Sequence, residues 1–125
     1  KLYDNGSVTW ESDIVSGNSA KGYDTPTGVY SIDSYMTSTA SSGSRVKLIS
    51  PEVDAEGNPT YTSYVDYWIP FIGNLVALHD ATWRSSFGGT IYQTNGSHGC
   101  VNLPASAAAS LYSLVKVGDV VVVHD

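Results

Sequence analysis

Apolar and polar residues alternate over several short stretches of this chain. Every second side chain from Tyr30 to Met36 would share one face of a strand, and the same spacing recurs from Val65 to Ile69. A third stretch, through Leu75 to Leu78, would place His79 at the end of a strand, where a scaffold can hold its ring rigidly. The run from Val120 to His124 predicts a last strand. The pattern therefore predicts a domain built mainly of short strands.

The period changes near the C-terminus. Apolar residues recur at helical spacing from Ala108 to Val115. Pro104 is tolerated in the first turn of a helix, and Gly118 is expected to stop it. We therefore expect a mostly β fold, a sandwich or barrel, with one short C-terminal α-helix.

Residues 37–45 and 50–62 show little periodicity and are rich in Ser, Thr, Gly and Pro, so they predict loops. Between them lies only the short apolar segment Val46–Ile49. We interpret residues 37–74 as a loop-rich insertion and a candidate lid. Its aromatic residues would either face a substrate or pack on the sheet; these are Tyr61, Tyr64 and Trp68.

Composition fits one small domain spanning residues 1–125 that can bury a core, and we expect a monomer. The formal net charge is −6, and the six Lys and Arg residues form no cluster, which argues against a nucleic-acid partner. The sequence contains no stretch long enough to span a membrane and no signal-peptide pattern. Any export signal or anchor would therefore lie outside this segment.

The single cysteine carries the strongest chemical signal. Cys100 lies in the tract Ser97–Asn102, and His79 lies upstream at the end of an apolar run. A thiolate is the attacking form of cysteine, and a nearby imidazole can hold its proton and lower its pKa. A lone cysteine can also pack as a small hydrophobe, but the small and polar neighbours here favour a turn. Such a turn could aim the backbone N–H groups of Gly99 and Cys100 at an oxyanion.

Several segments resemble the YkuD-type L,D-transpeptidase catalytic domain, most closely the form found in Gram-positive bacteria. The resemblance is carried by Ala77–Arg84, Phe87–Gly89 and Asn95–Pro104, which reproduce a histidine, a spacer and then Ser-His-Gly-Cys, an apolar residue and Asn. It extends over nearly the whole chain through Thr25–Tyr30, Val65–Phe71 and Val117–Val122. Lys1–Gly6 resembles the second half of the first hairpin, so the usual opening strand is expected to be truncated.

The resemblance implies roles for the motif residues. Cys100 would be the nucleophile, and His79 the general base, oriented by the backbone carbonyl of Asp80. The Asp80 carboxylate is an alternative third member of the triad, but it carries less weight than the carbonyl. His98 would line the site and support the nucleophile's loop, or else be purely structural. Ser97 belongs to the same motif, and the Gly99 N–H is an oxyanion-hole candidate.

Further residues are candidates for substrate binding. Asn102 would brace the turn through side-chain to backbone bonds, or else touch substrate. Arg84 could bind a substrate carboxylate in bidentate fashion or form an ordinary ion pair. Trp83, Tyr67 and Trp68 complete this group of candidates.

The function implied by the resemblance is peptidoglycan cross-linking. Cys100 would attack the amide before the terminal D-residue of a tetrapeptide stem, and the thioester would pass to an amine to give 3→3 cross-links. Water or a protein lysine as acceptor would make the chain an L,D-carboxypeptidase or an anchoring acyltransferase. Peptidoglycan stem peptides are the implied partners, carbapenem-type β-lactams the implied covalent inhibitors, and the outer side of the cytoplasmic membrane the implied location.

Two hypotheses from other classes remain open at this stage. His79, His98 and Cys100 could supply three ligands to a catalytic zinc ion, although His-Gly-Cys leaves a single intervening residue and no carboxylate cluster flanks it. A wall-binding module on the same fold would leave Cys100 inert. The transpeptidase hypothesis itself requires no cofactor and no metal.

Overall fold

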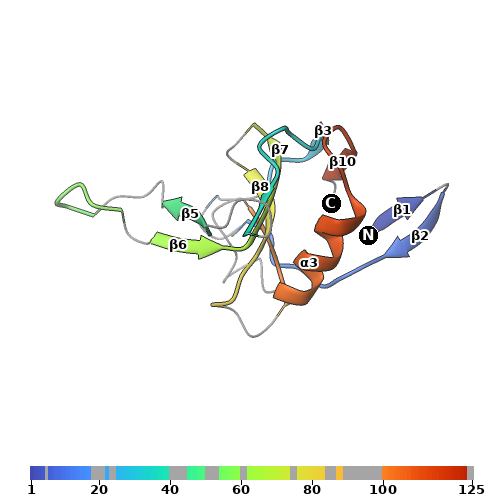
Figure 1. Cartoon of the computed structure of the whole chain (residues 1–125). Helices are drawn as coiled ribbons and strands as arrows, with labels where there is room; N and C mark the ends of the chain where they lie inside the picture. The colour runs from blue at the N-terminus through green and yellow to red at the C-terminus, as the bar shows by residue number, and fades with distance from the viewer. Residues whose placement is uncertain are drawn as a thin grey trace.

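A computed structural model describes most of the chain (Figure 1). The described residues are 1–4, 6–17, 22, 25–39, 45–49, 54–59, 62–73, 76–83, 87–88 and 100–123. The strands are β1 (Leu2–Asp4), β2 (Ser7–Trp10), β3 (Gly28–Ser31), β4 (Thr37–Ser38), β5 (Val46–Ile49), β6 (Thr62–Val65), β7 (Tyr67–Ile72), β8 (Val76–Asp80), β9 (Val101–Leu103) and β10 (Val120–Val123), and the helix is α3 (Ala105–Leu114).

The centre of the fold is a four-stranded sheet in the order β4-β7-β8-β9. β7 pairs with β4 and β8 in antiparallel fashion, whereas β8 and β9 run parallel. A parallel pair requires a long crossover, and the segment between Asp80 and Val101 supplies it. On its far side β9 is bonded through Asn102 to Val15 of the N-terminal segment, with both backbone N–H to O distances below 3 Å. The other strands pair as β1-β2, β3-β10 and β5-β6, and the described strands do not close into a barrel.

The two faces of the central sheet have different neighbours. One face packs against α3 and forms the main apolar core, which contains Ile32, Ile69, Leu103, Ala108 and Leu111. The other face carries a smaller cluster of Val65, Trp68 and Ala77, against which Cys100 packs. Successive side chains of a strand point to opposite faces. The alternation along β7, β8 and β9 therefore separates a structural face from the face that holds the thiol.

Helix α3 matches the predicted helical spacing but ends earlier than Gly118. Pro104 occupies the N-cap position without a side-chain cap, and the last helical residue is Leu114. Val115 is extended while its N–H still donates to Leu111. Gly118 lies in the turn beyond the helix, with φ +93°, a conformation that glycine adopts without strain.

Leu111→Ala is expected to lower the free energy of unfolding by about 2–3 kcal/mol, because it removes packing from the main core while retaining helix propensity. Leu114→Ala is the matched control on the same helix, since Leu111 is 5% exposed and Leu114 54% exposed. The control should change the free energy by less than about 1 kcal/mol. Denaturant unfolding followed by circular dichroism measures both; equal losses would contradict this account of the core.

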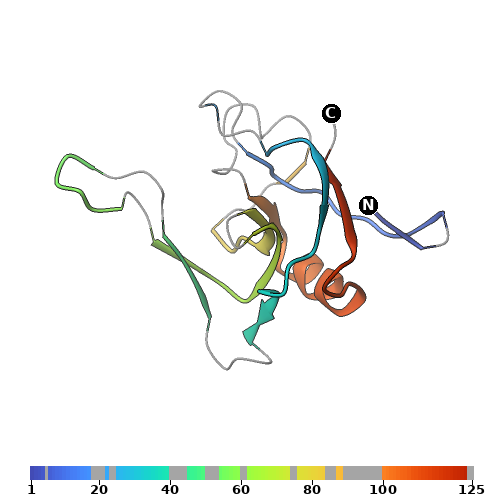
Figure 2. The ribbon, with the colours of Figure 1, turned by 90° about the horizontal axis from the view of Figure 1, so that it is seen from above.

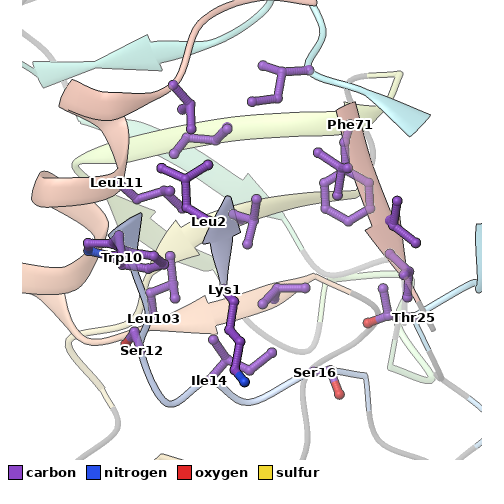
Figure 3. Close-up of a pocket in the computed structure, with 18 of the residues that line it drawn as sticks. Lys1, Leu2, Trp10, Ser12, Ile14, Ser16, Thr25, Phe71, Leu103 and Leu111 are labelled. Atoms are coloured by element: carbon purple, nitrogen blue, oxygen red, sulfur yellow. The ribbon is translucent and has the colours of Figure 1, made fainter. Parts of the chain in front are cut away.

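A cavity of about 700 Å³ lies between α3, β10 and the α3-facing side of the central sheet (Figure 3). Most of its lining side chains are apolar; Leu2, Trp10, Phe71, Leu103 and Leu111 surround it in the close-up. His79 and Cys100 are not among the described residues that line it. The cavity is therefore separate from the thiol-bearing face of the sheet.

The alternation from Tyr30 to Met36 predicts a longer strand than the structure has. β3 ends at Ser31, and Asp33 begins a turn. The Oδ1 atom of Asp33 accepts hydrogen bonds from Ser34 Oγ and the Tyr35 N–H, both at 3.3 Å. An aspartate that bonds the backbone two residues ahead stabilises a turn, and this local bond overrides the alternating pattern.

Within residues 37–74, β7 belongs to the central sheet, and the part that projects is the β5–β6 arm (Figure 1, Figure 2). The short apolar segment Val46–Ile49, between the two predicted loops, is a strand paired along its length with β6. At the base of the arm, Arg45 Nε lies 2.9 Å from Asp66 Oδ1 and the Arg45 guanidinium donates to the Tyr64 carbonyl at 3.0 Å. Val46 and Leu48 pack against the small cluster of the sheet against which Cys100 also packs. The base of the arm and the thiol therefore border the same cluster; that the arm moves as a lid stays a prediction.

Candidate active site

His79 is held in the middle of three strands. On β8 it pairs with Trp68 of β7 on one side and with Asn102 of β9 on the other. Its side chain is 2% exposed. Because paired residues of neighbouring strands share a face, the His79 ring lies on the face that carries Trp68, Ala77 and Cys100 rather than on the α3 face.

One ring nitrogen of His79 has a defined partner. Nδ1 lies 2.7 Å from the backbone carbonyl oxygen of Asp80. A carbonyl can only accept, so Nδ1 must carry the proton in this contact, and in a neutral ring Nε2 is then the basic nitrogen. The contact fixes both the tautomer and the orientation of the ring. This is the contact that the family resemblance implies for the general base.

The Asp80 carboxylate is engaged elsewhere. Oδ1 accepts the backbone N–H groups of Asp66 and Tyr67, each at 2.9 Å, and the side chain is almost fully buried. As the residue after His79 on the same strand, Asp80 points its side chain to the opposite face. The carboxylate therefore fixes the bend between β6 and β7, while its backbone carbonyl serves the imidazole.

Cys100 immediately precedes β9, in partial burial beside Ala77. Burial raises the pKa of the Cys100 thiol, and a backbone hydrogen bond from Ala77 opposes that rise. The sequence alone predicted a pKa lowered by a neighbouring imidazole; desolvation by burial acts in the opposite direction. The thiol is thus protonated at neutral pH, and its reaction requires a base that removes the proton.

Asn102 is the parallel-strand partner of His79 and is almost fully buried. Its backbone is tied to Val15, but its Oδ1 atom has no hydrogen-bond partner in the part of the chain that the structure describes. Oδ1 therefore provides no brace within the described residues, and the predicted brace of the turn, which lies outside them, stays a prediction. The main chain of Asn102 anchors β9.

Two indole rings lie close to the imidazole of His79. The Trp68 ring is nearly parallel to it, at 18° with a centroid separation of 5.9 Å, and the Trp83 ring is tilted by 40° at the same separation. Trp68 is buried in the sheet, while Trp83, just after β8, is half exposed. The structure therefore brings both predicted tryptophans to the histidine.

Tyr67 is not brought to this face. Its ring packs against Tyr112 of α3 with a centroid separation of 5.5 Å, and it borders the main core. Alternation along β7 accounts for this, because Tyr67 and Trp68 are adjacent and point to opposite faces. Tyr67 is thus a packing residue rather than a contact of the candidate site.

The remaining predicted site residues lie outside the described residues: Arg84, Ser97, His98 and Gly99, together with Tyr61 of the arm. The zinc hypothesis is left untested, because it depends on His98. The described residues contain no group of three or more His, Cys, Asp or Glu side chains placed to hold a metal ion. Within these residues no helix combines the length and the apolar character that crossing a bilayer requires.

The sequence did not indicate the contacts that enclose His79 and Cys100. The stacking of Trp68 on His79 depends on the β7–β8 register, and the packing of Cys100 depends on the cluster that Val65, Trp68 and Ala77 form on this face. The available signal was the match of two apolar residues, Ile69 and Leu78, as cross-strand partners. That match sets the register of β7 and β8, and this register pairs Trp68 with His79.

Comparison with known families assigns the fold. The sequence model of the YkuD family, described as the L,D-transpeptidase catalytic domain, matches residues 1–123. This chain belongs to that family. The predicted L,D-transpeptidase resemblance is confirmed, and so is the mostly β fold with a short helix near the C-terminus. No curated protein sequence matches the chain significantly.

Solved structures of L,D-transpeptidases have the same fold. The avibactam carbamoyl enzyme of Ldtfm is 34% identical with a TM-score of 0.80, covering 98% of this chain and 43% of that chain. The catalytic domain of Enterococcus faecium L,D-transpeptidase acylated by ertapenem is 34% identical with a TM-score of 0.73, covering 98% of this chain and 85% of that chain. A cysteine-to-serine mutant of the Enterococcus faecium enzyme is 33% identical with a TM-score of 0.72, and the match covers 98% of this chain and 44% of that chain. The chain thus spans less than half the length of the longer L,D-transpeptidases that it matches.

Proposed function

We propose that this domain is a cysteine-dependent peptidoglycan L,D-transpeptidase acting on the outer side of the cytoplasmic membrane. The observation that carries the proposal is the 2.7 Å contact between His79 Nδ1 and the Asp80 carbonyl, on the sheet face that also holds the only thiol of the chain. This contact leaves Nε2 as a base, and the Cys100 thiol, whose pKa is raised by burial, needs one.

The acylation step transfers one proton and exchanges one bond. His79 Nε2 takes the proton of Cys100 while Sγ bonds to the carbonyl carbon before the terminal D-residue of a tetrapeptide stem. Backbone N–H groups of Gly99 and Cys100 are the proposed donors to the oxyanion. The C–N bond then breaks, and the proton on His79 passes to the departing amine of the D-residue. The product is a thioester of Cys100.

Deacylation repeats the chemistry with a second amine. The side-chain amine of a diamino acid on a neighbouring stem attacks the thioester, and His79 accepts the proton that this amine loses. The C–S bond breaks and the thiol is restored, leaving a 3→3 cross-link. Cross-linking requires two stems to meet over one thiol, and we expect the β5–β6 arm, whose base packs against the same cluster as Cys100, to form part of that surface.

Product analysis tests the proposal directly. Incubation of the domain with a disaccharide-tetrapeptide should give a dimer whose mass equals two substrate molecules minus one free D-amino acid, detected by liquid chromatography and mass spectrometry, and the Cys100→Ala variant should give none. A product that has only lost the D-residue would overturn cross-linking and indicate an L,D-carboxypeptidase. An unchanged substrate in the presence of folded protein would overturn both.

A further inference from the structure

The imidazole of His79 lies next to two indole rings, each with its centroid 5.9 Å from that of the imidazole. Trp68 is 6% exposed and supports the ring from within the sheet. Trp83 is 50% exposed and covers the ring from the segment after β8. An indole that leaves half of its surface in water while contacting a fully buried imidazole contributes little to the core, so its position calls for another explanation.

The two protonation states of His79 interact differently with these rings. A cation within about 6 Å of an indole centroid is attracted by the ring's electron density, and a neutral ring lacks this attraction. Burial acts in the opposite sense, since it disfavours the charged form. In the proposed acylation His79 becomes cationic as it takes the Cys100 proton, so the indoles favour the charge at the moment it forms.

The described side chains next to His79 on the neighbouring strands differ in charge and direction. On β9, Asn102 is neutral, and Cys100, just before β9, is the titratable side chain; on β7, Trp68 is the neighbour and Tyr67 points to α3. On β8, the Asp80 carboxylate is turned away and bonded to the Asp66 and Tyr67 N–H groups. On β5, Val46 and Leu48 face the cluster, so Lys47 between them points away. The two indoles are thus among the groups placed to stabilise the imidazolium.

We propose that Trp83 is a positioning residue that stabilises the protonated form of His79 during acyl transfer. The inference rests on the proposed function, because it needs His79 to be the base for Cys100. Trp83 acts through His79 and not through the substrate, so its effect must appear even when the electrophile is too small to touch an indole. This distinguishes it from the substrate contact that the sequence suggests for the same residue.

The expected signature follows from the protonation states. The rate of Cys100 modification is expected to rise with pH over an acid limb, the range in which the imidazolium of His79 loses its proton. Because burial keeps the thiol largely protonated at neutral pH, Cys100 and His79 are thiol plus imidazolium below this range and mainly thiol plus neutral imidazole above it. Losing the indole destabilises every state that contains the imidazolium. The acid limb of the reactivity profile therefore moves to lower pH, while the fraction of reactive thiolate–imidazolium pair on the plateau falls.

The test compares Trp83→Leu with Trp83→Phe, using iodoacetamide as a small probe of Cys100 and ertapenem as a large one. Rates are measured from about pH 5 to about pH 10, and thermal unfolding checks the fold of each variant. For Trp83→Leu we expect the plateau rate with iodoacetamide to fall about threefold and the acid limb to move down by about half a pH unit. Trp83→Phe retains an aromatic face, so its plateau rate and the position of its acid limb should be close to those of the wild-type protein. Tyr35→Leu, at another exposed aromatic, is the matched control and should change neither.

The possible failures are distinguishable. An unchanged iodoacetamide profile with slower ertapenem acylation in Trp83→Leu would overturn the inference and make Trp83 a substrate contact. An unchanged rate with both probes would also overturn it. If wild-type Cys100 reacts with iodoacetamide no faster than free cysteine and does not react with ertapenem, the proposed function itself fails, whatever Trp83 does.

Discussion

Cys100→Ala is expected to abolish covalent capture of a carbapenem. A carbapenem presents a strained amide, and attack by the Cys100 thiolate opens the ring and leaves the inhibitor as a thioester. Incubation of the wild-type domain with ertapenem should add one inhibitor mass to the intact protein, and peptide mapping should place that mass on Cys100. The Ala variant should show no adduct. Ertapenem is the natural probe, because a 34% identical catalytic domain has been solved in the form acylated by this compound.

The substitution isolates the chemistry because it costs little packing. Cys100 lies at the border of the small cluster and is only partly buried, so loss of its sulfur leaves the core of Ile69, Leu103 and Leu111 intact. Cys100→Ser is the second control, since it keeps the shape but supplies a much weaker nucleophile. An ertapenem adduct on Cys100→Ala, or on a serine of the wild-type chain, would show that the mechanism is wrong.

The sequence predicted the elements whose signals are local. The spacing from Ala108 to Val115 identified α3, and alternation identified the strand that carries His79. It failed where a distant side chain decides the backbone path. The alternation from Val65 to Ile69 reads as one strand, but the chain bends at Asp66, where the carboxylate of Asp80 accepts two successive N–H groups. A partner 14 residues away leaves no trace in a period-two pattern.

The sequence predicted which residues form the candidate site but not the contacts that surround them. His79 and Cys100 follow from the motif, and alternation alone places the Asp80 carboxylate on the face opposite the imidazole. The direction of the Cys100 pKa could not be predicted, because it depends on how deeply the fold buries the thiol. Tertiary contacts, and not the motif, set the pKa of the Cys100 thiol and therefore how strongly its reaction depends on a base.

His79→Ala is therefore expected to slow ertapenem acylation and alkylation of Cys100 at neutral pH by about 10²–10⁴-fold, the usual contribution of a general base. His98→Ala should have a smaller effect. His79→Asn provides the sharper comparison: a side-chain amide can donate to the Asp80 carbonyl in place of Nδ1, at 2.7 Å in the native ring, but supplies no basic nitrogen in place of Nε2. The Asn variant should be as slow as the Ala variant while unfolding at a higher temperature.

The pH dependence of the His79 variants provides the second half of this test. Without a base, reaction requires the free thiolate, whose fraction grows as pH rises. Burial raises the pKa of Cys100, so the alkylation rate of His79→Ala should still be climbing at a pH where that of free cysteine has levelled off. The wild-type rate should instead reach its plateau at lower pH, set by deprotonation of the imidazolium. Coincident profiles for the wild-type and Ala proteins would mean that His79 does not take the proton of Cys100, and the base would then have to be sought elsewhere in the motif, first at His98.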